Sequence, residues 1–166
     1  MANWRQNIKG FTLIEVLVVL TIMSIMLGLV TANFAMDERQ SLQQEAHKLA
    51  LLMRHASDTA RTTGKPIAWQ ATKQGYIFLQ LEADGQHWKP LQNDSNLRPR
   101  ELPENMRLST AHIAGLPANS NDMVIFSPSG LNPAFDLTLQ SEHARLTITG
   151  DLLGKVVDFP AQEIKP

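Results

Sequence analysis

A single carboxylate stands near the start of an apolar run at the N-terminus of this 166-residue chain. The first ten residues carry Arg5 and Lys9, and residues 16–30, which follow Glu15, contain no charged side chain. A charge at membrane depth costs several kcal/mol unless a partner neutralises it. Because about 20 apolar residues cross a bilayer, the sequence predicts a membrane-spanning helix over residues 11–33 in which Glu15 needs a partner.

Two other interpretations of this segment are open. A secretory signal peptide has an apolar stretch of 7–15 residues before small residues at its cleavage site, and residues 31–35 form a poor site of that kind after a longer run. A plain single-span anchor fits the length but does not explain Glu15. If the segment spans the membrane, the positive charges of Arg5 and Lys9 keep residues 1–10 on the cytoplasmic side.

The helix is predicted to continue beyond the membrane. There is no proline before Pro66, and Gly64-Lys65-Pro66 provides a stop signal. Residues 34–64 carry apolar side chains at spacings of three and four, which predicts an amphipathic stem packed on the following sheet. These stripe residues are Leu42, Ala46, Leu49, Met53, Ala56 and Ala60.

Residues 65–166 are predicted to form a β-rich head. Short alternating or β-branched runs are separated by turn residues such as Asp84-Gly85. The fold class is therefore α+β, with a long helix packed on an antiparallel β-sandwich-like head of two small sheets. Residues 90–103 and 115–122 are predicted to be exposed loops that could contact partners. The predicted strands are 67–71, 76–81, 87–89, 106–113, 123–126, 135–140, 144–149 and 154–159.

Two motifs resemble those of a known superfamily. Lys9-Gly10-Phe11-Thr12-Leu13-Ile14-Glu15, opening the apolar run, resembles the signal of type IV pilins and pseudopilins. Phe126-Ser127-Pro128-Ser129-Gly130 resembles an element of the H-type minor pseudopilins of type II secretion, and FimT-like minor pilins carry a similar element. Without the resemblance, residues 126–130 predict a tight turn between two strands.

The resemblance implies how the chain is processed and assembled. Prepilin peptidase would cut after Gly10 and methylate the new amine of Phe11. The carboxylate of Glu15 would then pair with the Phe11 amine of a neighbouring subunit, which removes the cost of two isolated charges in lipid. Implied partners are the peptidase, the inner-membrane assembly platform, membrane lipid before assembly, and other major and minor pseudopilins.

The resemblance also implies a function and a location. The expected protein is a structural subunit near the tip of the periplasmic type II secretion pseudopilus, which helps to export folded proteins across the outer membrane. It would be a single-pass inner-membrane protein with its head in the periplasm. The alternatives are a FimT-like minor pilin of a type IV pilus, with a role in DNA uptake, and a membrane-anchored periplasmic enzyme or ligand-binding domain.

Composition and motifs argue against enzyme chemistry. The chain has no cysteine, which excludes a disulfide scaffold and a thiolate metal site. Its five histidines show no compact ligand spacing, so we predict no metal, no cofactor and no catalytic residue. The 15 Lys and Arg against 16 Asp and Glu become 13 against 16, a charge of −3, if Arg5 and Lys9 are removed. This balance predicts no nucleic-acid partner.

Overall fold

The computed structural model describes residues 12–91, 94–119 and 121–164, without the side chains of residues 28–36 and 163. The chain divides into two units, Met1–Asp37 and Glu38–Pro166. We call the second the head unit, and each unit is described by itself. The predicted boundaries at residues 10, 33 and 64 belong to processing and membrane location, and they remain predictions.

Helix α1 runs from Leu13 to Thr63, as the apolar and amphipathic patterns predict. It ends where the sequence places its stop signal. Gly64 adopts a φ of 70° and its N–H donates to the carbonyl of Ala60 at 3.0 Å. This is a left-handed C-terminal cap, which glycine adopts at little steric cost.

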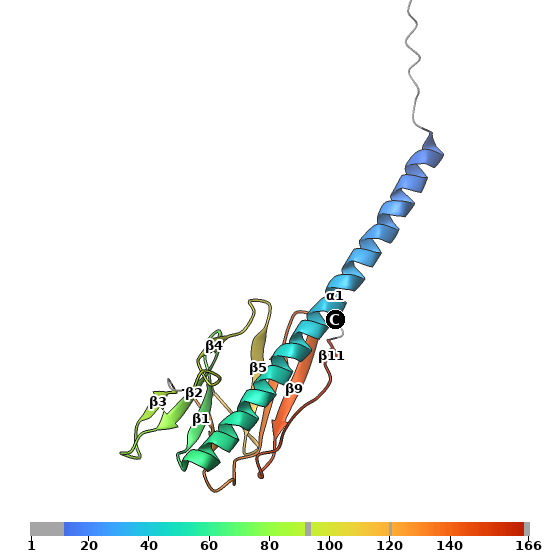
Figure 1. Cartoon of the computed structure of the whole chain (residues 1–166). Coiled ribbons are helices and arrows are strands. Elements are labelled where there is room, and N and C mark those ends of the chain that lie inside the picture. The colour runs from blue at the N-terminus through green and yellow to red at the C-terminus, as the bar shows by residue number, and fades with distance from the viewer. Residues whose placement is uncertain (1–11, 92–93, 120, 165–166) are drawn as a thin grey trace, which may run out of the picture. The chain divides into compact units, whose positions relative to one another are not determined.

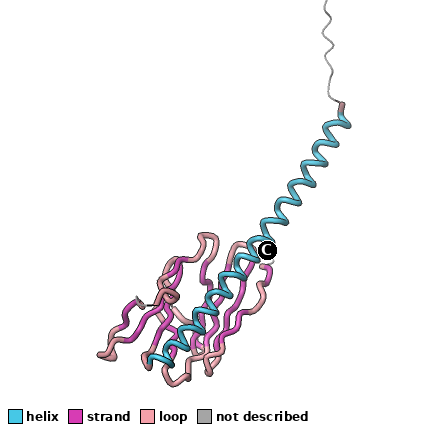
Figure 2. Tube along the Cα trace, in the orientation of Figure 1, coloured by secondary structure: helices cyan, strands magenta, loops and turns pink. Residues whose placement is uncertain are grey.

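Two antiparallel sheets make up the rest of the head unit (Figures 1 and 2). Sheet A has the order β3-β2-β1-β7, with β4 also paired to β2. Sheet B has the order β10-β9-β8-β5-β6, with β11 also paired to β9. The strands are β1 Ile67–Ala71, β2 Gly75–Leu81, β3 Trp88–Pro90, β4 Arg100–Glu101, β5 Arg107–Ile113, β6 Leu116–Pro117, β7 Met123–Phe126, β8 Phe135–Gln140, β9 Ala144–Gly150, β10 Val156–Asp158 and β11 Gln162–Glu163.

One core joins the helix to both sheets. The part of α1 after residue 38 crosses both sheets in Figure 1, and its buried side chains share a cluster with inward residues of each sheet. Phe126 of β7 and Phe135 of β8 meet edge to face with ring centroids 6.4 Å apart, which links the two sheets. The helical members of the core are Leu42, Ala46, Leu49, Ala50, Met53, Ala56 and Ala60, each no more than 1% exposed.

The predicted α+β class, with a helix packed on two antiparallel sheets, is confirmed, and so are the main strands. The structure adds the short strands β4, β6 and β11, which lie in segments that the sequence analysis did not assign to strands. The prediction that residues 90–103 form an exposed loop is wrong in part. Leu91 and Leu97 are 8% and 0% exposed, because they close the core under this connection.

Candidate functional site

The predicted cleavage and methylation residues, Gly10 and Phe11, lie outside the described residues. Glu15 is described and lies in the first turn of α1. The backbone N–H of Glu15 donates to two oxygens of Thr12. Its nitrogen lies 3.1 Å from the carbonyl oxygen and 3.3 Å from the side-chain hydroxyl. Thr12 is therefore the N-cap of α1, and Thr-x-x-Glu is the spacing of a capping box. Sequence reasoning missed this signal, although both residues belong to the motif at residues 9–15.

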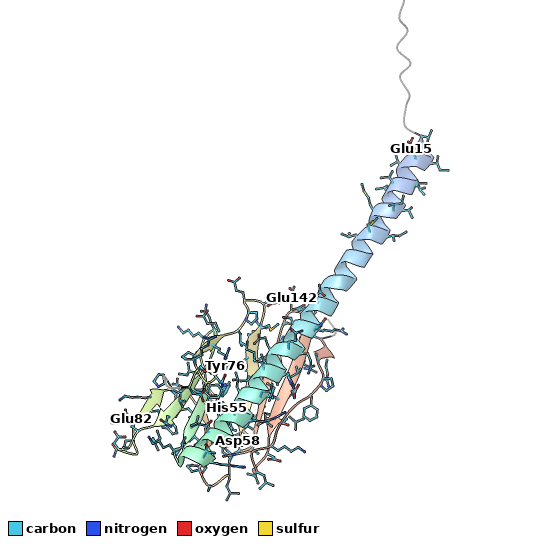
Figure 3. The ribbon with its side chains drawn as sticks, in the orientation of Figure 1. Glu15, His55, Asp58, Tyr76, Glu82 and Glu142 are labelled. Carbon is cyan, nitrogen blue, oxygen red and sulfur yellow. The ribbon has the colours of Figure 1, made fainter. Side chains whose placement is uncertain are left out.

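The carboxylate of Glu15 is exposed among apolar neighbours (Figure 3). Among the described residues, no side chain forms a hydrogen bond or an ion pair with it. Large apolar side chains on every side of these turns are between 42% and 83% exposed, from Leu13 to Leu27. Within the part of the chain that is described, no helix reaches the length and apolarity needed to cross a membrane.

Three histidine–carboxylate pairs connect α1 to the rest of the head unit. Glu38 accepts from the backbone N–H of Glu142 at 2.9 Å and lies 2.8 Å from Nδ1 of His143. His47 Nδ1 lies 3.4 Å from an oxygen of Asp158. His55 Nε2 lies 2.9 Å from Asp94, in the connection between β3 and β4. These pairs flank the apolar stripe and fix the position of the helix on the sheets.

The strand β10 is held to α1 by a second set of polar contacts. Arg54 Nε donates to the carbonyl of Val156 at 2.8 Å. Gln43 donates to Asp158 at 3.1 Å and accepts from the N–H of Ala161 at 3.0 Å. These hydrogen bonds attach the C-terminal segment to the helix.

Hydrogen bonds lower the pKa of two of these carboxyls. Burial alone would raise the pKa of Glu38, but hydrogen bonds from His143, Ser141 and the backbone of Glu142 take it below its usual value. Burial likewise opposes the lowered pKa of Asp94, which the N–H of Asn96 and the ring of His55 produce. The hydrogen bonds therefore stabilise the charged form of each carboxyl group relative to its neutral form.

We expect the head unit to lose stability in acid because of these two groups. A lowered folded pKa stabilises the protein above the unfolded value, and that stability is lost as the pH falls through the folded value. Glu38→Gln should lower the free energy of unfolding by up to about 1 kcal/mol at pH 7 and by much less at pH 3. Urea unfolding at both pH values measures this. An equal loss at both would show that the charge of Glu38 does not contribute.

The element at residues 126–130 is more than a turn between strands. The predicted tight turn is present, with the N–H of Gly130 donating to the carbonyl of Ser127 at 2.9 Å. Gly130 has a φ of 81°, and a Cβ there would lie 2.9 Å from Nε of Arg61 on α1. Arg61 donates to the carbonyls of Gly130 at 3.3 Å and Leu153 at 2.8 Å. Glycine thus lets the last turns of the helix approach this turn closely.

A buried pair of polar side chains completes this contact. Asn132 is 3% exposed, and its side-chain oxygen accepts from the N–H of Ser127 at 2.8 Å. Its amide nitrogen donates to the hydroxyl of Ser57 at 3.4 Å, and Ser57 is 2% exposed. Sequence reasoning did not identify Ser57, Arg61 or Asn132. The element therefore docks the turn between β7 and β8 onto the end of α1.

One group of side chains has the composition of a metal site. Ligand atoms of Glu82, Asp84 and His87 lie within 4.8 Å of one another on the turn between β2 and β3. Sequence reasoning missed the group because it treated Asp84 as a turn residue. Asp84 already accepts from the N–H groups of Gln86 and His87 and contacts the His87 ring, and Glu82 contacts Lys89. These contacts explain the arrangement as a hairpin turn, so we assign no metal to it.

The fold is similar to that of two solved structures. A structure of the minor pseudopilin EpsH from the type 2 secretion system of Vibrio cholerae is similar, with a TM-score of 0.61 and 20% identity, covering 72% of this chain and 97% of that one. A second EpsH structure gives a TM-score of 0.62 at 17% identity, covering 76% and 99%. At these identities the likeness establishes the fold.

Two family profiles match the sequence. The profile described as a prokaryotic N-terminal methylation motif matches residues 5–31, and that described as type II transport protein GspH matches residues 45–154. The chain belongs to the family of the type II transport protein GspH. The match includes the turn at residues 126–130, in agreement with the resemblance seen in the sequence.

Two curated relatives carry the name type II secretion system protein H. The Pseudomonas aeruginosa protein is 32% identical over 93 residues, which are 55% of this chain and 54% of that protein. The Aeromonas hydrophila protein is 28% identical over 107 residues, which are 63% and 58%. The chain thus spans little more than half the length of these relatives in the matched regions.

Proposed function

We propose that this protein is a minor pseudopilin, a structural subunit near the tip of the periplasmic type II secretion pseudopilus that assists the export of folded proteins across the outer membrane. The observation that carries the proposal is the buried helical stripe from Leu42 to Ala60, packed on two sheets in a pseudopilin fold. The match to the N-terminal methylation motif supports it. The polar side chains of Ser57, Arg61 and Asn132 join segments of the fold, which favours a structural role over an enzymatic one.

The same proposal assigns a location to each segment. Residues 1–10 are a cytoplasmic leader, residues 11–33 anchor the chain in the inner membrane, and residues 34–64 connect the anchor to a periplasmic head at 65–166. The exposed apolar side chains around Leu13 to Leu27 support this assignment, because such a surface needs lipid or other helices to cover it. Membrane lipid covers it before assembly, and neighbouring pseudopilins cover it afterwards.

Glu15 is the assembly residue in this proposal. Its carboxylate is exposed in an apolar segment and is free of a described partner, so a positive group from another chain can reach it. Cleavage after Gly10 would create such a group, the amine of Phe11. Pairing the two charges offsets the cost of placing each in lipid and favours addition in register. The inner-membrane assembly platform would deliver the subunit to this contact.

The test of the function is complementation. Deletion of the gene from its source organism should abolish secretion of proteins through the type II system, and the full chain expressed from a plasmid should restore it. Outer-membrane leakage is the control, because a damaged membrane also releases proteins. Unchanged secretion in the deletion strain would contradict the assignment to this machine.

The processing prediction can be checked on the purified protein. We expect the mature chain to begin at Phe11 with a methylated amine, because Gly10 presents an unobstructed backbone to the peptidase. Intact-mass measurement of membrane-extracted protein reports both modifications. A mature N-terminus near Ala35, or an uncut chain in cells that contain prepilin peptidase, would contradict the pilin-type assignment of the N-terminus.

A further inference from the structure

Sheet B presents one face to the core and the other to solvent. Along β8 and β9 buried and more exposed residues alternate strictly, so that Leu137 and Leu146 point inward. Strand β5 joins the same pattern through a register shift between Leu108 and Thr110. We call the opposite side the outer face of sheet B. On these three strands it consists of Arg107, Thr110, His112, Asp136, Thr138, Gln140, Arg145, Thr147 and Thr149.

Two arginines lie in one row across this face. The strand registers place Gln140 opposite Arg107 on one side and opposite Arg145 on the other. Gln162 of β11 extends the row beyond Arg145. Neighbouring strands are about 4.8 Å apart, so the backbones of the two arginines are separated by about 10 Å. Both arginines are exposed, and neither forms an ion pair with any of the described residues.

The row next to the arginines contains no charged side chain. The next row is Thr110, Thr138 and Thr147, and the last two hydroxyls are 3.3 Å apart. A shallow depression of about 740 Å³ lies over the two rows. On the strands of this face the acid is Asp136, four residues from Gln140 along β8, which is about 13 Å at 3.3 Å per residue. Beyond the row, Glu104 and Glu142 line a neighbouring depression with Arg107 and Gln140, but among the described residues no ion pair joins either carboxylate to Arg107 or Arg145.

This pattern differs from that of a sheet face that only meets water. Opposite charges on neighbouring strands stabilise a sheet, whereas this row carries two like charges without an acid. The outward residues of β5, β8 and β9 include no Lys and no Glu, the residues depleted at protein interfaces, while Arg is enriched there. Half-exposed Phe159 borders the face, since its N–H donates to the carbonyl of Thr147 at 3.0 Å.

We propose that the outer face of sheet B binds an extended acidic segment of another protein subunit, whose carboxylates pair with Arg107 and Arg145. Charge complementarity selects this occupant, because each guanidinium can hold one carboxylate by two parallel hydrogen bonds. Acidic side chains two and four residues apart share one side of an extended segment and lie about 7 and 13 Å apart, which brackets the spacing of about 10 Å between the arginine backbones. Gln140 and the threonine row would hydrogen-bond the backbone between them.

Two arginines are too few to favour a nucleic acid. A backbone of phosphates is bound by a stripe of many cations, and the formal charge of this chain is −1. The inference rests on the proposed function only for the identity of the partner, which would be a neighbouring pseudopilin. The chemistry of the face can therefore be tested separately from secretion.

The test is a titration of the full chain in detergent with a labelled eight-residue peptide of alternating Glu and Ser, followed by fluorescence anisotropy. We expect saturable binding that weakens with salt, and none to a matched peptide of Gln and Ser. Arg107→Gln and Arg145→Gln should each weaken binding about two- to fivefold, as expected for exposed ion pairs. The double variant should weaken it about tenfold or more. Arg98→Gln, which removes an exposed arginine outside this face, should leave it unchanged.

Several outcomes would overturn the inference. These are no saturable binding of the acidic peptide, an equal loss with Arg98→Gln, or tighter binding of a 20-base-pair DNA duplex than of the peptide. Circular dichroism of each variant separates a lost site from a lost fold, and Arg107→Lys with Arg145→Lys keeps the charges if the glutamine variants unfold. If the wild-type chain restores secretion but does not bind the acidic peptide, this inference fails and the proposed function stands.

Discussion

A chain that begins at Lys65 is expected to unfold or aggregate, whereas a chain that begins at Phe34 is expected to fold. The longer fragment keeps the helical stripe that closes the core of the head unit. The shorter one exposes the inward faces of both sheets, because seven residues of α1 between Leu42 and Ala60 are no more than 1% exposed. It also loses the pairs from Glu38, His47 and His55 to the sheets and loops.

The magnitudes make this a large effect. Truncating a buried Leu or Met to Ala costs about 2–5 kcal/mol, so Leu42, Leu49 and Met53 alone represent about 6 kcal/mol or more. A domain of this size is stable by about 5–15 kcal/mol in total. Circular dichroism and thermal unfolding of the two fragments measure the difference. Equal melting temperatures would mean that the stripe does not pack on the head, and Leu42 to Ala60 would then be a surface for neighbouring subunits.

A pair of point variants provides a matched control within one helix. Leu49 is 1% exposed and Leu51 is 48% exposed. Leu49→Ala should lower the free energy of unfolding by about 2–5 kcal/mol, and Leu51→Ala should lower it by less than about 1 kcal/mol. Urea unfolding of the soluble fragment that begins at Phe34 measures both. Equal losses would show that general helix destabilisation, rather than packing on the sheets, explains the effect of removing the stem.

Much of the fold is predictable because its signals are local. The spacing of Leu42, Ala46, Leu49 and Met53 defines one side of a helix, and that side is buried. The alternation in residues 135–140 and 144–149 identifies β8 and β9, with their apolar side toward the core. Each of these patterns lies within one element, so a single sequence contains all of its evidence.

The polar contacts between distant segments were not predictable in the same way. His47 and Asp158 are 111 residues apart, and Ser57 and Asn132 are 75 residues apart. Nothing in the local sequence of either partner indicates the other, because the contact depends on how the helix lies on the sheets. The strands β4, β6 and β11 were missed for a related reason. Two residues are too few to show alternation, and only pairing with a neighbouring strand defines them.

The candidate assembly site was predictable as a motif but not as geometry. The lone carboxylate of Glu15 is visible in the sequence, while the N-cap at Thr12 depends on where the helix begins, which the apolar run does not define. The cap uses the backbone N–H of Glu15, not its carboxylate. The two features of the motif are therefore separable, since Thr12 caps the helix through the backbone of Glu15 and the carboxylate of Glu15 forms no hydrogen bond with the described residues.

Glu15→Leu is expected to abolish incorporation into the pseudopilus while leaving cleavage and membrane insertion intact. Cleavage after Gly10 depends on the backbone that precedes the helix, and insertion becomes more favourable when a charge is removed. Assembly would lose the partner of the Phe11 amine. An uncompensated charge in lipid costs at least about 2.5 kcal/mol, which corresponds to a fall in incorporation on the order of 100-fold. Quantitative blotting of sheared pseudopili and secretion assays, with the variant as the sole copy, measure it.

Two control variants separate the carboxylate from the helix start. Thr12→Val removes the cap hydroxyl but keeps Glu15, and losing a cap costs only about 1 kcal/mol, so secretion should persist. Glu15→Gln keeps the shape of the side chain and removes its charge, so it should fail as Glu15→Leu does if ion pairing drives assembly. Normal secretion by Glu15→Gln would show that a hydrogen bond suffices. Failure of Thr12→Val together with normal secretion by Glu15→Leu would move the assembly role from the carboxylate to the cap, because the helix start would then be the feature that neighbouring subunits require.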